Sequence, residues 1–177
     1  MKFLLALLLI SGLTTGQWEF KSAPTQSSMT ILGTSSLHDW ESEVGDFVVS
    51  GTMAENLISN LKVEVNVESI KSGKSIMDDK TYDALKSEKF PTIYFAAESL
   101  TLSGGKATGL GVLTLAGESR TITLEAETAP KGANAVQVDG KVSIKMSDYG
   151  IDPPTAMFGT LITGDQVTIQ YQLLLNK

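Results

Sequence analysis

The chain has 177 residues, a formal net charge of −6 from 14 basic and 20 acidic side chains, and no cysteine. The acidic balance argues against binding to nucleic acid or to anionic membrane surfaces, and the lack of cysteine excludes a disulfide-stapled miniprotein. The length fits one domain with its own core, and a hydrophobic content of 42% argues against disorder.

The first sixteen residues, MKFLLALLLISGLTTG, have the composition of a secretory signal peptide. One lysine precedes an unbroken apolar run over residues 3–10, and small or hydroxylated residues follow. A membrane anchor is the alternative, but the run is well short of the ~20 residues that span a bilayer. We therefore predict a signal peptide over residues 1–16, a mature domain over residues 17–177, and a periplasmic or secreted location without stable membrane insertion.

Most of the mature chain alternates apolar and polar residues with a period of two, which is typical of strands with one buried and one wet face. Residues 61–68 show this alternation most cleanly. The predicted strands, in chain order, cover residues 17–22, 28–33, 41–53, 61–68, 92–102, 107–116, 120–127, 135–146 and 163–175. Short turns are predicted at 23–27, 56–60, 104–105, 117–118 and 130–134, and a longer loop over 147–160.

Residues 75–86 interrupt the alternation with a helical pattern. Met77, Thr81 and Leu85 recur every four residues, and a proline follows before the strand alternation restarts. Ser75 followed by Asp78 fits a capping box, and an acidic residue in the first turn complements the helix dipole. A short helix is therefore predicted between two strands. Whether it gates the fold or is a fixed plug stays open.

Eight or nine alternating strands and one short helix predict an all-β fold. Open edges on so many strands invite edge-to-edge pairing, and closure into a barrel removes those edges. A two-sheet sandwich is the alternative. The long strands and the glycines inside them favour an eight-stranded antiparallel β-barrel, which is wide enough to be filled by its own side chains or to hold one small ligand.

Residues for catalysis or metal binding are few. His38 is the one histidine, and the sequence offers it neither a cysteine nor the serine of a G-x-S-x-G motif. Asp78, Asp79 and Asp83 lack the spacing of a calcium loop, and no H-E-x-x-H zinc motif is present. We therefore expect no enzyme, no metal and no cofactor, and assign His38 a structural role in which a carbonyl or carboxylate satisfies it.

One face of each predicted strand is almost entirely aliphatic. A packed core is one interpretation of this face, and a tunnel for an apolar chain is the other. At roughly 0.8 kcal/mol per CH₂, a chain of about fifteen carbons offers about 12 kcal/mol gross, so useful affinity survives the cost of ordering the ligand. The candidate lining residues are Phe47, Val49, Val65, Val67, Ile93, Phe95, Leu124, Ile144 and Tyr171.

Three motifs in order resemble the YceI-like family. LKSEKFPTIYF over 85–95 is similar to the signature after the family's short helix, GLGVLTLAG over 109–117 to its G-x-L-T-L-x-G hairpin, and DYGI over 148–151 to its D-F-G-I loop. The resemblance covers residues 28–175. It implies an extended, lipocalin-like antiparallel β-barrel, usually exported, whose interior in some members holds a polyisoprenoid or related amphiphile.

Two functions follow from the resemblance and the apolar face. The first is non-enzymatic binding or transport of an isoprenoid-type lipid, a polyprenyl chain or a quinone, in the barrel interior. The second is a structural or interaction role, in which the barrel is filled by its own side chains and acts through its surface. Residues 71–89 are near neutral within an acidic chain, so an anionic head group is least repelled there. The oligomeric state is open, a homodimer included.

Overall fold

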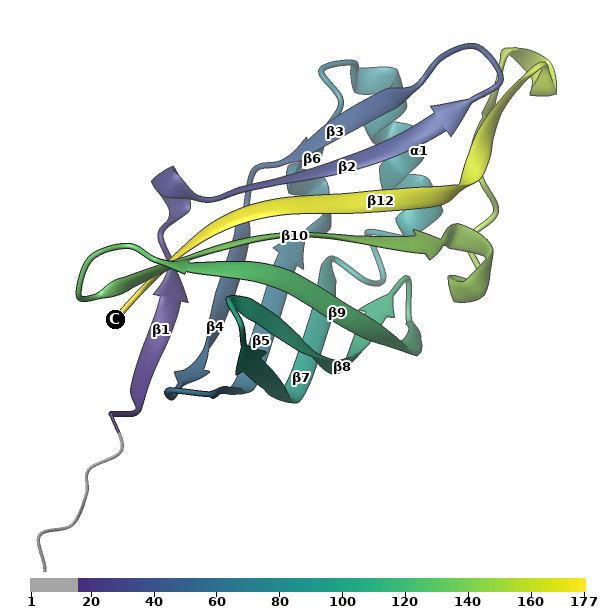
Figure 1. Ribbon diagram of the computed structural model, residues 1–177. Helices are drawn as coiled ribbons and strands as arrows, with labels where there is room; N and C mark the ends of the chain where they lie inside the picture. The colour runs from purple at the N-terminus through teal and green to yellow at the C-terminus, as the bar shows by residue number, and fades with distance from the viewer. Residues whose placement is uncertain (1–15) are drawn as a thin grey trace, which may run out of the picture.

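The computed structural model describes residues 16–177, which form an antiparallel β-barrel with one α-helix (Figure 1). The strands are β1 (Trp18–Ser22), β2 (Ser28–Ser35), β3 (Trp40–Val44), β4 (Phe47–Met53), β5 (Leu57–Asn66), β6 (Ile70–Lys71), β7 (Thr92–Ser103), β8 (Lys106–Leu115), β9 (Glu118–Pro130), β10 (Ala135–Lys145), β11 (Thr155–Ala156) and β12 (Leu161–Asn176). The helix is α1 (Ser75–Leu85), and the 3₁₀ turns are η1 (Pro24–Gln26), η2 (Val67–Ser69), η3 (Met146–Tyr149) and η4 (Met157–Gly159). The predicted signal peptide, up to residue 15, lies outside the described residues.

Eight strands close the barrel in the order β1-β4-β5-β7-β8-β9-β10-β12, each antiparallel to its neighbours. Closure depends on β1, which pairs with β4 on one edge and with the end of β12 on the other, where Lys21 lies opposite Asn176. After η1 the chain continues as β2, which pairs with the earlier part of β12. The predicted eight-stranded antiparallel barrel is confirmed.

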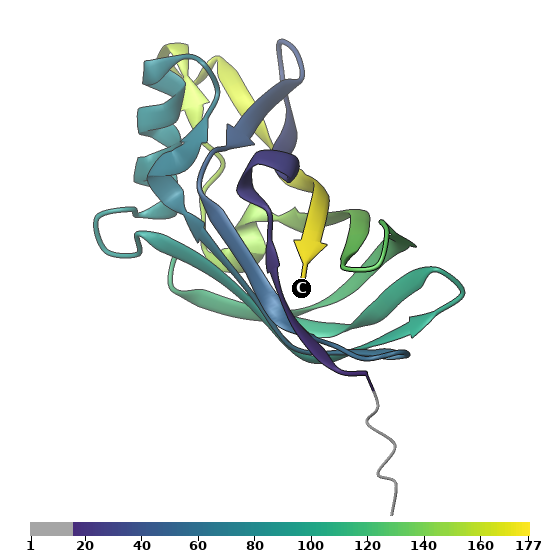
Figure 2. The ribbon, with the colours of Figure 1, turned by 90° about the vertical axis from the view of Figure 1, so that its left-hand side faces the viewer.

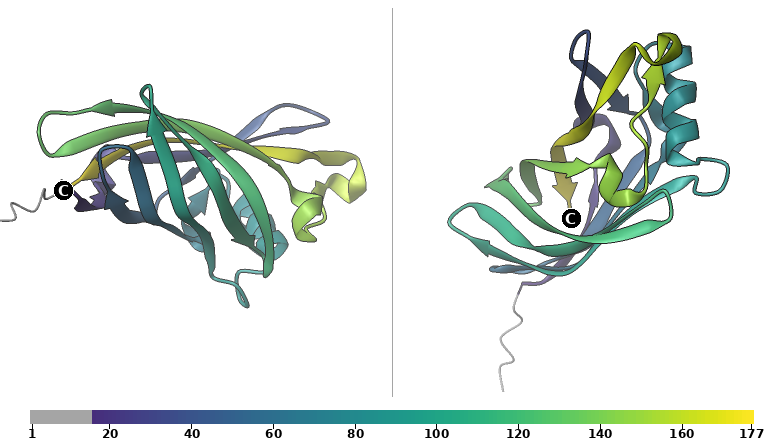
Figure 3. Two further views of the ribbon diagram at one scale, coloured as in Figure 1. Left: turned by 60° about the horizontal axis from the view of Figure 1, so that its bottom comes forward. Right: turned by 90° about the vertical axis from the view of Figure 1, so that its right-hand side faces the viewer.

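One end of the barrel carries most of the remaining elements. β2 pairs with β3 and β3 with β6, which extends the sheet past the closed part, and α1 stands beside this extension (Figure 2). α1, η3 and η4 gather at the same end, and the C-terminus lies at the other (Figures 1 and 3). We call the end with α1 the helix end.

Among the predicted boundaries that are wrong, two lie between β3 and β5. The run over 41–53 is two strands, β3 and β4, separated at Gly45-Asp46, where the Gly45 N–H donates to Ser69 O at 3.0 Å. The turn predicted at 56–60 lies earlier, since the Ala54 N–H donates to Leu57 O at 2.8 Å and β5 begins at Leu57. In the first place the alternation runs through a short turn, whereas in the second it breaks within β5 itself, so periodicity alone misplaces the strand ends.

The DYGI motif covers a gap in the barrel wall. β9 and β10 pair over residues 126–130 and 136–140, and η3 packs against β9, β10 and β12 beyond that ladder. Gly150 has a φ of 63°, which suits glycine and lets its N–H donate to Ser147 O at 3.1 Å. Ser147 in turn donates to Asp165 of β12 from N and Oγ, at 2.8 and 2.6 Å. These contacts hold the buried Tyr149 and Ile151 under the wall.

Candidate ligand-binding cavity

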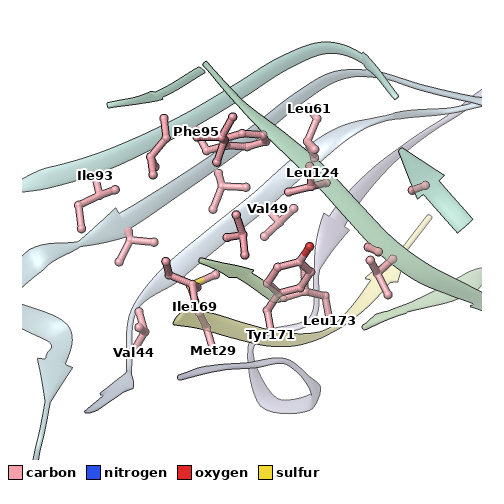
Figure 4. A pocket seen from close by; sticks show the side chains of 18 of the residues that line it. Met29, Val44, Val49, Leu61, Ile93, Phe95, Leu124, Ile169, Tyr171 and Leu173 are labelled. Atoms are coloured by element: carbon pink, nitrogen blue, oxygen red, sulfur yellow. The ribbon is translucent and has the colours of Figure 1, made fainter. Parts of the chain in front are cut away.

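An apolar cavity of about 140 Å³, the inner cavity, lies inside the barrel (Figure 4). Except for Tyr171, each of its described lining residues is aliphatic, methionine or phenylalanine. Six of the nine predicted site residues line it: Val49, Val65, Ile93, Phe95, Leu124 and Tyr171. The interior is therefore not completely filled by its own side chains.

A second cavity of about 350 Å³, the helix-end cavity, lies between α1 and the barrel. The predicted apolar stripe of α1, Met77, Thr81 and Leu85, lines it, as does Ile144, the seventh predicted site residue. Five residues line both cavities: Ile31, Ile70, Ile93, Leu113 and Ile169. The shared lining makes the two cavities adjoining parts of one apolar interior.

Two predicted site residues, Phe47 and Val67, line neither cavity. Phe47 is half-buried and packs against the core from the start of β4. Val67 is only 1% exposed, but β5 ends at Asn66 and Val67 begins η2. Its N–H donates to Pro91 O at 2.9 Å. The alternation predicted a strand through residue 68, whereas the 3₁₀ turn rotates Val67 away from the strand's inward face.

The helix-end cavity reaches the surface at a mouth formed by the exposed residues His38, Lys74 and Thr155 and the half-buried Lys80. No aspartate or glutamate is among its described lining residues. His38 Nδ1 lies 2.7 Å from Asp39 O, so a backbone carbonyl satisfies it, as predicted. The charged side chains in the described lining of this cavity are therefore lysines.

Among residues 16–177, no group of three or more histidine, aspartate or glutamate side chains is placed to hold a metal ion. In the same part of the chain, no helix has both the length and the apolar character needed to cross a membrane.

Polar contacts on the face beside the cavity-lining stripe fix α1 to the barrel. The capping-box prediction is wrong: Lys74 is the N-cap and makes no side-chain cap, while Asp78 is buried and accepts from Ser72 N and Oγ at 2.7 and 2.6 Å. Tyr82 Oη lies 3.0 Å from Glu68 O and 3.1 Å from Ile70 O, close enough to donate to either, and the Lys71 ammonium donates to Tyr82 Oη. One face of α1 is thus tied to η2 and β6, and the other faces the cavity.

Glycines opposite aromatic residues keep the interior open. A Cβ on Gly111 would lie 2.2 Å from Phe95 Cζ and 2.9 Å from Ala96 O, and a Cβ on Gly140 would lie 2.4 Å from Tyr171 Oη. The Phe95 ring therefore packs closely over Gly111 of β8, and the Tyr171 ring packs closely over Gly140 of β10. These glycines within the strands are therefore sites where an aromatic ring approaches the backbone closely.

Gly111→Ala is expected to destabilise the protein by about 1–3 kcal/mol, because the added methyl group collides with the Phe95 ring and with backbone. The displaced ring should also narrow the inner cavity. Chemical denaturation measures the loss. Gly45→Ala is the matched control, since the nearest atom to its Cβ would be 3.4 Å away. Equal stabilities of the two variants would contradict the close contact.

Sequence reasoning missed several lining residues that lie outside the best alternating runs. Trp40 and Ile151 line the helix-end cavity from a strand start and a loop, where periodicity gives no direction. Ser42 lines it from within the predicted strand 41–53, but as a polar residue it gave no sign of an apolar face. Ile31 and Ile70 line both cavities. Ile31 could have been predicted as a lining residue, since it shares an apolar face with Met29 in the predicted strand 28–33.

Comparisons with known proteins agree with this architecture. A model of the YceI-like domain matches residues 18–175. The fold is shared by the crystal structure of BcnA from Burkholderia cenocepacia, with a TM-score of 0.72 and 19% identity over 86% of this chain and 98% of that one. It is also shared by the structure of a polyisoprenoid binding domain from Saccharophagus degradans, with a TM-score of 0.69 and 13% identity over 89% of this chain and 97% of that one. The Campylobacter jejuni YceI protein is similar over 68% of this chain and 73% of its own (TM-score 0.57, 22% identity). No curated protein matches in sequence. Because the domain model spans nearly all of the described chain, the protein belongs to the YceI-like domain family.

Proposed function

We propose that this protein binds an isoprenoid-type amphiphilic lipid, a polyprenyl chain or a quinone, inside the barrel, and carries it without chemical change. The observation that carries the proposal is the shared apolar lining of the inner and helix-end cavities. The charged residues at the mouth of the helix-end cavity are lysines. Membership of the YceI-like family supports it, and one structural neighbour is a polyisoprenoid binding domain. The predicted signal peptide supports a periplasmic or extracellular location for this activity.

The energetics favour an occupied interior. At about 24 cal/mol per Å³, an empty cavity of about 140 Å³ costs the fold about 3 kcal/mol. Apolar cavities of about 150 Å³ stay dry and accept small apolar molecules. Each five-carbon isoprene unit that enters offers about 4 kcal/mol gross. The alternative, a barrel filled by its own side chains and acting through its surface, predicts a closed interior, so both cavities weigh against it.

Native mass spectrometry of the purified protein tests the proposal. We expect a co-purified hydrophobic molecule or, after delipidation, uptake of added geranylgeraniol in a one-to-one complex. Affinity should rise along the series geraniol, farnesol and geranylgeraniol, because each unit buries more apolar surface. Lipid binding would be contradicted if the purified protein carried no hydrophobic molecule and took up none of the three alcohols.

The lysines of the mouth should favour an anionic end group. Lys74→Glu/Lys80→Glu is expected to weaken binding of farnesoic acid roughly fivefold and to leave farnesol binding unchanged, since exposed charge pairs contribute modestly. A fluorescent-lipid displacement assay measures both ligands. Lys62→Glu/Lys131→Glu changes the net charge equally, at exposed positions outside both cavities, and is the control. If both double variants respond alike, the mouth does not hold the end group.

A further inference from the structure

The hydroxyl of Tyr171 is a buried polar atom in the wall of an otherwise apolar cavity. Tyr171 is 7% exposed, and its Oη has no hydrogen-bond partner among the described residues. Of the described residues that line the inner cavity, it is the one with a polar side-chain atom. A buried hydroxyl without a partner is unfavourable, so a phenylalanine would fill this position at lower cost.

The neighbouring strands place this hydroxyl. Tyr171 lies opposite Gly140 in the β10–β12 ladder, and the glycine leaves room for the phenol, as its Cβ would be 2.4 Å from Oη and 2.6 Å from Cζ. The β9–β10 ladder ends at this same glycine, opposite Ala126. Figure 4 shows the Tyr171 oxygen directed among the side chains that line the cavity, between the labelled Val49 and Leu124.

Tyr149 provides a comparison within the same molecule. Its Oη is also buried without a partner among the described residues, but Tyr149 belongs to the cluster under η3 and lines neither cavity. A ligand in the barrel interior can therefore satisfy Tyr171 and not Tyr149.

We propose that Tyr171 Oη donates a hydrogen bond to a neutral acceptor oxygen of the bound lipid, so that the ligand is an apolar chain bearing a carbonyl or similar oxygen in the part that reaches the inner cavity. This inference rests on the proposed lipid binding and specifies the ligand's chemistry. The acceptor is neutral because no charged residue is among the described lining of this cavity, and an unpaired buried charge is strongly unfavourable. Any charged group of the same ligand stays at the mouth, near Lys74 and Lys80.

The phenol is suited to act as the donor. Burial raises the pKa of Tyr171 to about 12, so the hydroxyl keeps its proton at neutral pH. Its partner must then supply a lone pair, which a ketone, quinone or ester carbonyl does and a saturated or unsaturated hydrocarbon chain does not.

A matched pair of ligands tests the hydrogen bond. The probes are farnesylacetone and the hydrocarbon in which CH₂ replaces its carbonyl, measured by displacement of a fluorescent lipid from wild type, Tyr171→Phe and Tyr149→Phe. The ratio of ketone affinity to hydrocarbon affinity is expected to fall about tenfold in Tyr171→Phe and to stay at the wild-type value in Tyr149→Phe. Thermal unfolding without ligand should show Tyr171→Phe at least as stable as wild type, because the substitution removes an unsatisfied group.

The outcomes separate the two proposals. Wild type that binds neither probe contradicts lipid binding itself. Wild type that binds both, with the same affinity ratio in Tyr171→Phe, overturns the hydrogen bond while lipid binding stands, and the hydroxyl is then satisfied by a buried water only.

Discussion

Leu124→Trp is expected to weaken geranylgeraniol binding about 100-fold, because the larger ring would displace three or four chain carbons from the lumen, a loss of about 3 kcal/mol. Leu124 lies on β9, is half-buried, and points into the inner cavity among Val49 and Phe95 (Figure 4). The ring has space to enter because the cavity is not filled by protein. A displacement assay with a fluorescent isoprenoid measures the change.

The matched control is Leu110→Trp on the outer face of the adjacent strand. Leu110 is 62% exposed and lies opposite Thr123, next to Leu124 in the β8–β9 ladder. Leu110→Trp introduces the same side chain outside the lumen, so the affinity for geranylgeraniol should stay at the wild-type value. Near-ultraviolet circular dichroism and thermal unfolding establish that both variants fold. A folded Leu124→Trp protein with wild-type affinity would show that the ligand does not occupy the inner cavity.

Much of the barrel could be predicted because side-chain direction in a strand follows from position alone. Val49, Val65, Phe95 and Leu124 all reach the lumen, since each lies on the apolar side of an alternating run. Closure of the barrel follows from the physical cost of exposed strand edges, but the register in which β1 and β12 pair cannot be predicted from the sequence pattern. Lys21 and Asn176 meet at the seam because of the accumulated twist of the whole sheet, which no local pattern encodes.

The helix end was less predictable because its residues come from turns and short elements. Val67 carries the right alternation but sits in η2, where backbone hydrogen bonding to Pro91 overrides the period. Asp78 fits a capping-box spacing, yet its carboxylate satisfies the loop at Ser72 rather than the helix N-terminus. The family resemblance predicted a helix at this position, while its contacts depend on which backbone groups the loop leaves unpaired.

Asp78→Ala is expected to destabilise the protein by about 2 kcal/mol and to speed lipid release about tenfold, because it leaves the Ser72 N–H and hydroxyl without their carboxylate partner. The polar contacts of Asp78 and Tyr82 lie on a different face of α1 from Met77 and Leu85, which line the helix-end cavity. Weakening the polar side should therefore let α1 swing from the mouth. Chemical denaturation and stopped-flow transfer of the fluorescent lipid to vesicles measure the two effects.

The same contact predicts the acid response of wild type. Hydrogen bonds from the Ser72 hydroxyl and N–H lower the pKa of Asp78 below its ordinary value of 3.8. A depressed folded-state pKa stabilises the fold at pH values above about 4 and loses that stabilisation as the pH falls through the folded value. In acid, the lipid release rate of wild type should thus approach that of Asp78→Ala. The variant should lack this acid-induced increase in release rate. Asp79→Ala, at the exposed neighbouring position, should stay within about 0.5 kcal/mol of wild type. If Asp78→Ala loses stability but releases lipid at the wild-type rate, α1 is a fixed plug and the ligand leaves elsewhere.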